Sequence, residues 1–131
     1  METVDLEQID LYEAEPPFTR LNKIMVDNIS VNNPPFSVGI GIYRQGEKAE
    51  MHAHAKEVEV MLFLKGSGII RLPDGSDIEL KPNRLLYFPP GEAHQIFNTG
   101  QEPLEFLFIY SPSGPEAGIR KWKTIAQRKS S

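Results

Sequence analysis

Short apolar segments separated by proline and glycine set the pattern of this sequence. Val, Ile, Leu, Phe and Tyr fill runs of about four to eight residues, the length of ordinary strands, and turn signals such as Pro73-Asp74-Gly75 lie between them. This pattern is typical of an all-β sandwich or barrel. The predicted strands are residues 20–30, 36–44, 58–65, 69–72, 77–80, 85–88, 93–98 and 104–110.

The predicted strand at 36–44 has two different faces. Alternation places Val, Ile and Ile on one face and Gly39, Gly41 and Tyr43 on the other. Glycine weakens a strand but lets another group approach closely. The glycine face therefore either packs tightly against a neighbouring strand, which is the simpler interpretation, or lines a ligand cavity with Tyr43 pointing inward.

The predicted strand at 58–65 is apolar on both faces except for one carboxylate. Glu59, Met61 and Phe63 share one face, and valines and leucines occupy the other. We therefore expect this strand to be buried on both sides. A lone buried carboxylate is costly unless it is paired or bound to a metal, so Glu59 needs a partner.

The two ends of the chain differ from its centre. Residues 1–19 are acidic and read as an N-terminal arm. Near the other end, Ser113 precedes Pro115 and Glu116 in a pattern that favours a helix start. Ile119, Trp122 and Ile125 then recur at helical spacing. We predict a short amphipathic α-helix at about 115–127 that packs Trp122 onto the sheet.

Composition narrows the class of protein. The chain has 131 residues, the size of one domain, with a net charge of −4 and no cysteine. Disulfides and thiolate metal ligands are thus excluded, and no basic stripe favours nucleic acid. The N-terminal sequence does not resemble a signal peptide, and no apolar run approaches a membrane span. We expect a cytoplasmic protein without membrane or nucleic-acid partners.

Candidate metal chemistry lies in the three histidines. His52 and His54 are two residues apart, Glu59 follows, and His94 comes after Pro89-Pro90-Gly91. Three imidazoles and a carboxylate are a ligand set for a transition-metal ion. Since Glu59 has the opposite parity to His54, residues 55–57 must turn the chain to bring both into one cavity. Glu50 and Glu57 are alternative carboxylates, although a solvated position is the simpler interpretation for both.

These residues resemble the two motifs of the cupin superfamily. The first motif is Gly, five residues, His, one residue, His, three or four residues, Glu, six residues, Gly, and it is matched by Gly46, His52, His54, Glu59 and Gly66. The second motif is Gly, five residues, Pro, one residue, Gly, two residues, His, three residues, Asn. Its matches are Pro89, Gly91, His94 and Asn98.

Two asparagines of the second motif region need comment: Asn83 departs from the motif, and Asn98 matches it. Asn83 stands where the family usually has glycine. Asn tolerates positive φ better than most residues, so we expect the turn to survive. We expect Asn98 to support the turn through hydrogen bonds with the backbone rather than to bind metal.

The resemblance implies a conical β-barrel of jelly-roll type, forming a single cupin domain over residues 1–131. The core barrel would span about 20–112, between the arm and the C-terminal helix. Small cupins are commonly homodimers, and exchange of the N-terminal arm is one way to build such a dimer. The resemblance also implies one metal ion inside the barrel, held by His52, His54, Glu59 and His94, with open positions for water or substrate.

Nitrogen and oxygen ligands without sulfur suit Fe, Mn, Ni, Co, Zn or Cu as the divalent ion. The candidate pocket walls are Tyr43, Met61, Phe63 and Ile96, which are mainly apolar. They favour a dioxygenase-like enzyme acting on a small oxygenated substrate. Two alternatives stay open: an isomerase or lyase acting on a sugar, uronate or small carboxylate, with Tyr43, Tyr87 or Tyr110 as acid or base, and a non-catalytic module that binds or senses a ligand through the metal.

Overall fold

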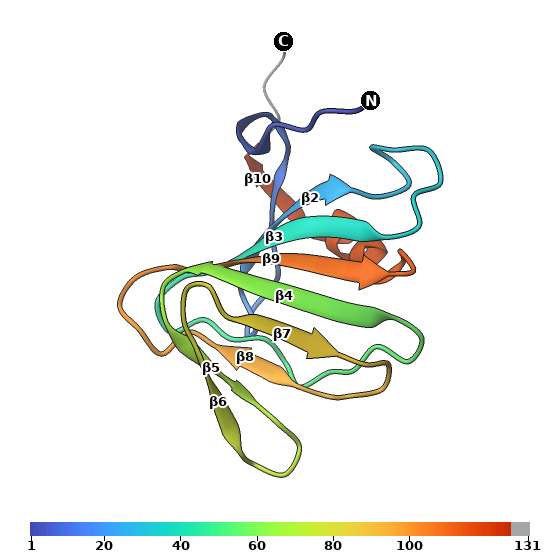
Figure 1. Cartoon of the computed structure of the whole chain (residues 1–131). Coiled ribbons are helices and arrows are strands. Elements are labelled where there is room, and N and C mark those ends of the chain that lie inside the picture. Colours follow the sequence, from blue (N-terminus) through green and yellow to red (C-terminus); the bar gives the residue numbers. More distant parts are fainter. Residues whose placement is uncertain (127–131) are drawn as a thin grey trace.

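The computed structural model describes residues 1–126 and contains two β-sheets within that range (Figure 1). Two short 3₁₀ helices, η1 and η2, accompany the strands. The elements are η1 (Leu6–Gln8), β1 (Leu11–Glu13), β2 (Leu21–Val26), β3 (Ser37–Tyr43), β4 (Val58–Lys65), β5 (Gly68–Arg71), β6 (Asp77–Leu80), β7 (Leu85–Phe88), β8 (Gln95–Phe97), β9 (Leu104–Ser111), η2 (Pro115–Lys121) and β10 (Lys123–Ala126).

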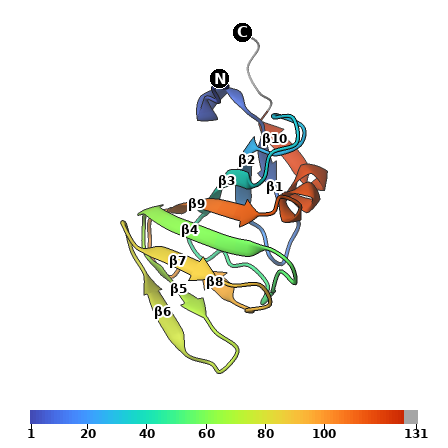
Figure 2. The same ribbon diagram turned by 45° about the vertical axis from the view of Figure 1, so that its right-hand side comes forward.

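The strands form a seven-stranded sheet in the order β10-β1-β2-β3-β9-β4-β7 and a three-stranded sheet in the order β6-β5-β8. All neighbouring strands run antiparallel. Both views place the small sheet below the β4 and β7 end of the large sheet (Figures 1 and 2). Side chains from both sheets, including Met61, Phe63, Ile70 and Ile96, are fully buried. This arrangement confirms the predicted all-β fold.

Strand β4 is buried on one face only. Glu59, Met61 and Phe63 point into the interior, with at most 2% of each residue exposed. The opposite face is half-buried or open, and Leu64 is 44% exposed. The expectation that β4 is covered on both sides is wrong, because its second face belongs to the outer surface of the sheet. Neighbouring β7 carries an exposed Tyr87 on that surface.

The glycine face of β3 packs against β9, its hydrogen-bonded neighbour. The rings of Phe108 and Phe106 fill the space that a Cβ atom would occupy at Gly39 and Gly41. Glycine is therefore needed at these two positions because the phenyl rings lie directly over the backbone. The interpretation of close packing is confirmed, and Tyr43 at the end of the same face is also buried.

The N-terminal arm joins the large sheet of its own chain. Strand β1 pairs with β2 on one side and with β10 on the other. Figure 2 shows β1 lying among these strands. Exchange of the arm between two copies, and the homodimer it would build, stay predictions.

The predicted α-helix at about 115–127 is wrong in type and length. The chain forms the 3₁₀ helix η2 over seven residues and then the strand β10, while residue 127 lies outside the described residues. Pairing with β1 satisfies backbone groups of 123–126, and this tertiary contact outweighs the helical spacing of the apolar residues. Trp122 packs against the core as expected. In residues 1–126, no helix is long and apolar enough to cross a membrane.

A buried ion pair fastens η2 to the end of β2. Arg120 donates from Nε to Asp27 Oδ2 and from Nη2 to Asp27 Oδ1, both at 2.8 Å. The backbone N–H groups of Ile29 and Ser30 also donate to Asp27 Oδ1. Burial raises the pKa of Asp27, but these hydrogen bonds outweigh burial and hold it below its ordinary value.

Replacing Asp27 by Asn should lower the free energy of unfolding at pH 7 by roughly 1–3 kcal/mol, because Arg120 loses a charged, bidentate partner. A depressed folded-state pKa means that this stabilisation is present above the ordinary pKa of about 3.9 and is lost as the pH falls through the folded-state value. Urea denaturation at pH 7 and at several values below pH 4 measures the difference.

The difference between wild type and D27N should therefore shrink in acid. The exposed Asp5 provides a matched control, and Asp5→Asn should change stability little at either pH. A difference that is the same at pH 7 and in acid would contradict the role assigned to the charge of Asp27.

Candidate metal centre

Backbone pairing brings two of the histidines together. His52 N–H donates to the His94 carbonyl at 3.0 Å, and His94 N–H donates back to the His52 carbonyl at 2.9 Å. Gly91 N–H donates to the His54 carbonyl at 2.8 Å, which attaches His54 to the turn that precedes His94. Residues far apart in the sequence thus become neighbours without belonging to a regular strand.

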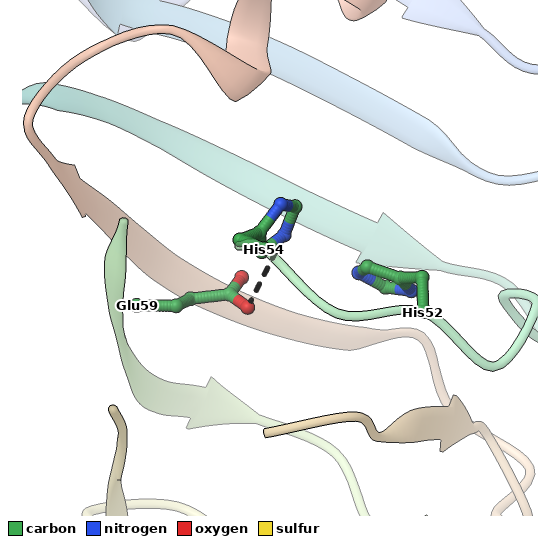
Figure 3. A group of neighbouring side chains, drawn as sticks. All are labelled: His52, His54 and Glu59. Carbon is green, nitrogen blue, oxygen red and sulfur yellow. Dashed lines mark ion pairs between the residues drawn. The ribbon is translucent and has the colours of Figure 1, made fainter. Parts of the chain in front are cut away.

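Glu59 enters the same space from β4. The chain bends at Ala55 and Lys56, as the parity of His54 and Glu59 requires. Glu59 then lies opposite Phe88 of β7 and Tyr110 of β9 in the sheet register. It is only 2% exposed, and its carboxylate points toward the His54 ring (Figure 3).

The ligand atoms of this cluster lie close to one another. Glu59 Oε1 is 2.9 Å from His94 Nε2 and 3.7 Å from His54 Nε2. One ligand atom from each of His52, His54 and Glu59 lies within 4.8 Å of the others. The ring centroids of His52 and His94 are 4.9 Å apart.

The free atoms of the cluster fit a cation. Glu59 Oε1, His54 Nε2 and His94 Nε2 are buried, and none makes a hydrogen bond to the described part of the chain; Glu59 Oε1 and His94 Nε2 lie 2.9 Å apart, but this contact is not a hydrogen bond. His52 Nδ1 and His94 Nδ1 each donate to a backbone carbonyl, those of Glu50 at 2.9 Å and Glu92 at 3.0 Å. A neutral ring held in this way has its lone pair on Nε2, the usual state of a metal-binding histidine.

Electrostatics favours the neutral form of His54. Burial lowers its pKa and outweighs the nearby Glu59 carboxylate, and the other two histidines of the cluster act in the same direction as burial. A neutral imidazole can bind a metal ion, whereas an imidazolium cannot. Packing also fixes two of the rings, since Phe88 stacks on His94 at 4.0 Å and Tyr110 meets the edge of His54 at 4.8 Å between centroids.

The cluster opens onto a cavity of about 250 Å³. Tyr43, Met61 and Ile96 lie on its wall, but the prediction for Phe63 is not met. Phe63 is fully buried and packs against Phe106, with ring centroids 4.9 Å apart, so it lies behind the wall. The cavity is lined by Arg20, Asn22, Tyr43, Glu50, His52, Ala53, His54, Glu59, Met61, Ile96, Phe106, Phe108, Tyr110, Pro115, Gly118, Ile119 and Trp122.

Several polar residues on this wall were missed by sequence reasoning. Arg20 and Asn22 come from the start of β2, and Glu50 lies beside His52. A signal was present in β2, because Arg20 and Asn22 have the same strand parity as buried Ile24. Polar side chains on the inward face of a strand are unusual unless they have a function or a partner.

The turns around the site follow the predicted backbone conformations. Asn83 has a φ of 72°, and Gly91 has a φ of 84°. Asn98 Nδ2 donates to the carbonyls of Tyr43 and Glu102 at 2.8 and 2.9 Å. The expected roles of Asn83 and Asn98 are thereby confirmed.

Comparison with known families agrees with this geometry. The model of the cupin domain family matches residues 39–110, more than half of the chain. The chain belongs to the cupin family. The matched region contains both sequence motifs and all four residues of the candidate metal centre.

The similar curated proteins include enzymes and a binding protein. Glucose-6-phosphate isomerase of Pyrococcus horikoshii is 36% identical over 85 residues, which cover 62% of this cupin and 43% of the isomerase. The isomerase of Thermococcus gammatolerans is 38% identical, with coverages of 61% and 45%. The oxalate-binding protein of Thermotoga maritima is 34% identical over 64 residues, with coverages of 49% and 52%. This cupin spans about half or less of these relatives' length.

Solved structures show the same fold at low identity. A predicted oxalate decarboxylase from Thermotoga maritima superposes with a TM-score of 0.75 at 22% identity, covering 85% of this cupin and 99% of that chain. The polyketide cyclase RemF from Streptomyces resistomycificus superposes with a TM-score of 0.76 at 17% identity, with coverages of 98% and 88%. At such identities the likeness concerns the fold alone.

Replacing His52 by Ala should remove most of the metal from the purified protein, because one of few nitrogen ligands is lost. Elemental analysis of protein purified without added metal measures the content per chain. Met51→Ala is the matched control, since Met51 is a neighbouring residue with 40% of its surface exposed. Equal metal content in H52A and wild type would contradict the assignment.

The two candidate carboxylates can be separated by a pair of variants. Glu59→Gln should weaken metal binding by about tenfold or more, since a charged oxygen ligand becomes a neutral amide. Glu57→Gln should leave metal binding unchanged, because Glu57 does not line the cavity. Competition with a chelator measures both affinities. If E57Q loses metal and E59Q keeps it, the ligand is Glu57.

Proposed function

We propose that this cupin is a metal-dependent enzyme that moves a proton on a small oxygenated molecule, as isomerases and lyases do. His52, His54, Glu59 and His94 would hold one divalent transition-metal ion. Support comes from the buried ligand atoms of His54, Glu59 and His94, which have no hydrogen-bond partner among the described residues. When bound, the ion would act as a Lewis acid on a carbonyl or hydroxyl oxygen of the substrate.

The observation that carries the reaction class is the set of ionisable groups beside the cluster. Tyr43, Tyr110 and Glu50 line the same cavity as His52 and His54 but are not needed as ligands. Proton transfer requires such groups within reach of the reacting atoms. Tyr87, the third tyrosine considered from the sequence, is 61% exposed on the outer surface and has no part in this site.

The three groups suit different roles. Burial raises the pKa of Tyr43 and of Tyr110, and the nearby Glu59 carboxylate adds to both effects. Both tyrosines thus keep their proton. Tyr110 is hydrogen-bonded to Glu59, so Tyr43 is the tyrosine that would donate to substrate oxygen. Glu50, whose side chain is exposed at the cavity, is the candidate base.

In an isomerisation, Glu50 would take a proton from the carbon next to a carbonyl group. The electron pair of that C–H bond forms a carbon–carbon double bond, and the carbonyl oxygen becomes an oxyanion that accepts a hydrogen bond from Tyr43. The oxyanion then gains a proton as the hydroxyl group on the adjacent carbon loses one, and delivery of the abstracted proton to the former carbonyl carbon completes the isomerisation. In a lyase, the same electron pair would instead expel a leaving group from the adjacent carbon.

The curated relatives support this class without deciding the substrate. The matches at 34–38% identity over 85 residues are named glucose-6-phosphate isomerase. Their match covers less than half of their own length. The likeness therefore favours an isomerase-type reaction and leaves the choice of substrate to the cavity of this cupin.

A dioxygenase is the second candidate, and the apolar part of the cavity favours it. Met61, Ile96, Phe106 and Phe108 give one side of the wall a hydrocarbon surface. Such a surface suits a fairly apolar enol or diketone. The polar residues on the opposite part of the wall are the reason to place proton transfer first.

Proton transfer predicts exchange with solvent. Protein loaded in turn with Fe, Mn, Ni, Co and Zn and incubated in D₂O with sugars, uronates and small oxo acids should place deuterium on carbon, as seen by NMR. Glu50→Gln should lower kcat by about 10²-fold or more while the metal content stays unchanged. Glu79→Gln is the matched control, because Glu79 is exposed on β6, away from the cavity.

Two other results would replace the proposal. Uptake of O₂ by the iron-loaded protein with enols or diketones, without deuterium exchange, would establish the dioxygenase. Tight binding of a ligand without turnover under any metal would establish the non-catalytic binding module.

A further inference from the structure

We propose that Arg20 binds a carboxylate group of the substrate, with Asn22 beside it, so that this cupin selects small carboxylic acids. The inference rests on the proposed function and adds to it a substrate class. The proposed carboxylate site is formed by Arg20, which directly precedes β2, and by Asn22 of β2. Both residues are far in the sequence from the candidate metal ligands.

Arg20 is held at the cavity by two contacts. Its Nη1 donates to the Phe18 carbonyl at 2.7 Å. Its guanidinium lies over the ring of Trp122, 4.9 Å from the centroid, which is a cation–π contact. Both Arg20 and Trp122 line the cavity. These contacts orient the guanidinium and leave most of its five N–H donors available.

The charge of Arg20 has no carboxylate partner in residues 1–126. By contrast, Arg44, Arg71 and Arg120 each form an ion pair with an aspartate or glutamate. Burial raises the pKa of Tyr43, and the Arg20 guanidinium opposes that rise, which places it near the Tyr43 hydroxyl. An arginine that faces a cavity without a counter-charge is suited to bind an anion there.

Asn22 supplies an independent observation. It is only 7% exposed and lines the same cavity, yet its Oδ1 has no hydrogen-bond partner among the described residues. A buried amide oxygen without a donor costs free energy; the hydroxyl group of a hydroxy acid could donate to it, whereas a carboxylate oxygen would need the amide N–H. The amide can present either its oxygen or its nitrogen to such a ligand.

The size of the cavity limits the ligand. A volume of about 250 Å³ corresponds to roughly eight water molecules at about 30 Å³ each. Arg20, Tyr43 and Glu59 all line this cavity, so the anion site and the ligand cluster share one small space. A short acid that carries an oxo or hydroxyl group can therefore reach both.

The charge pattern favours a carboxylate over a phosphate. The planar guanidinium matches the two oxygens of a carboxylate. A phosphate monoester, like a phosphorylated side chain, carries a charge of about −1.5 to −2 at pH 7. Arg20 is the one cation of Lys or Arg type on the described wall, and Glu50 and Glu59 share that wall. A dianion would meet more repulsion there than a single carboxylate.

Trp122 offers a direct test, since it is the only tryptophan of the chain and lies under Arg20. Lactate and pyruvate, which each carry a single carboxylate, should change the fluorescence of the metal-loaded protein, and calorimetry gives the same affinities independently. Arg20→Gln should weaken both acids by about tenfold or more, and Arg20→Lys by less. Lactamide, which is neutral, should bind wild type and R20Q alike, and the Arg71→Gln variant should bind the acids as wild type does.

Equal affinity of lactate for wild type and R20Q would overturn the inference, as would saturable binding of inorganic phosphate in place of the acids. Metal content and turnover separate this failure from failure of the proposed function. R20Q should keep its metal, so loss of acid binding with intact metal supports the inference. If the wild type turns over non-acidic substrates and R20Q does so equally, the proposed function stands and the role of Arg20 falls.

Discussion

Burial of the Glu59 carboxylate is the constraint on which the rest of the site depends. An ionised carboxylate in a protein interior costs several kcal/mol unless other charges or donors compensate for it, and Glu59 is only 2% exposed. In this fold, imidazole rings from two segments that are far apart in the sequence surround the Glu59 carboxylate. The mutual backbone hydrogen bonds of His52 and His94 hold those segments together, so the fold is built to keep the donor atoms converging on this carboxylate.

Much of the strand structure could be predicted because its signals are local. Alternation and Pro-Gly punctuation located β4, β6 and β7 with the boundaries found in the structure. The C-terminal segment could not be predicted in this way. Ile119, Trp122 and Ile125 have helical spacing, but the backbone after Trp122 pairs with β1. This pairing joins two strands that are more than 100 residues apart, β1 and β10, so no local sequence pattern predicts it.

For the site, the four candidate ligands could be named from the sequence, and the structure brings them together. The opposite wall could not be named, because it depends on how β2 lies against β3 and η2. Asn22 lies opposite Gly41 in that register, which alternation alone does not reveal. Phe63 shows a second limit of strand alternation. It lies on the same face of β4 as Glu59 and Met61, but it does not line the cavity. Parity gives the face of a residue and not its depth.

Asn83 has a consequence for how relatives of this protein are found. With a φ of 72°, and with its N–H donating to the Phe63 carbonyl at 2.8 Å, it performs a task for which glycine is the usual residue. The requirement at this position is a positive φ angle, and asparagine can adopt that angle as glycine does. A search pattern that insists on glycine would discard this chain, whereas one that tolerates asparagine would retrieve it and others with the same replacement.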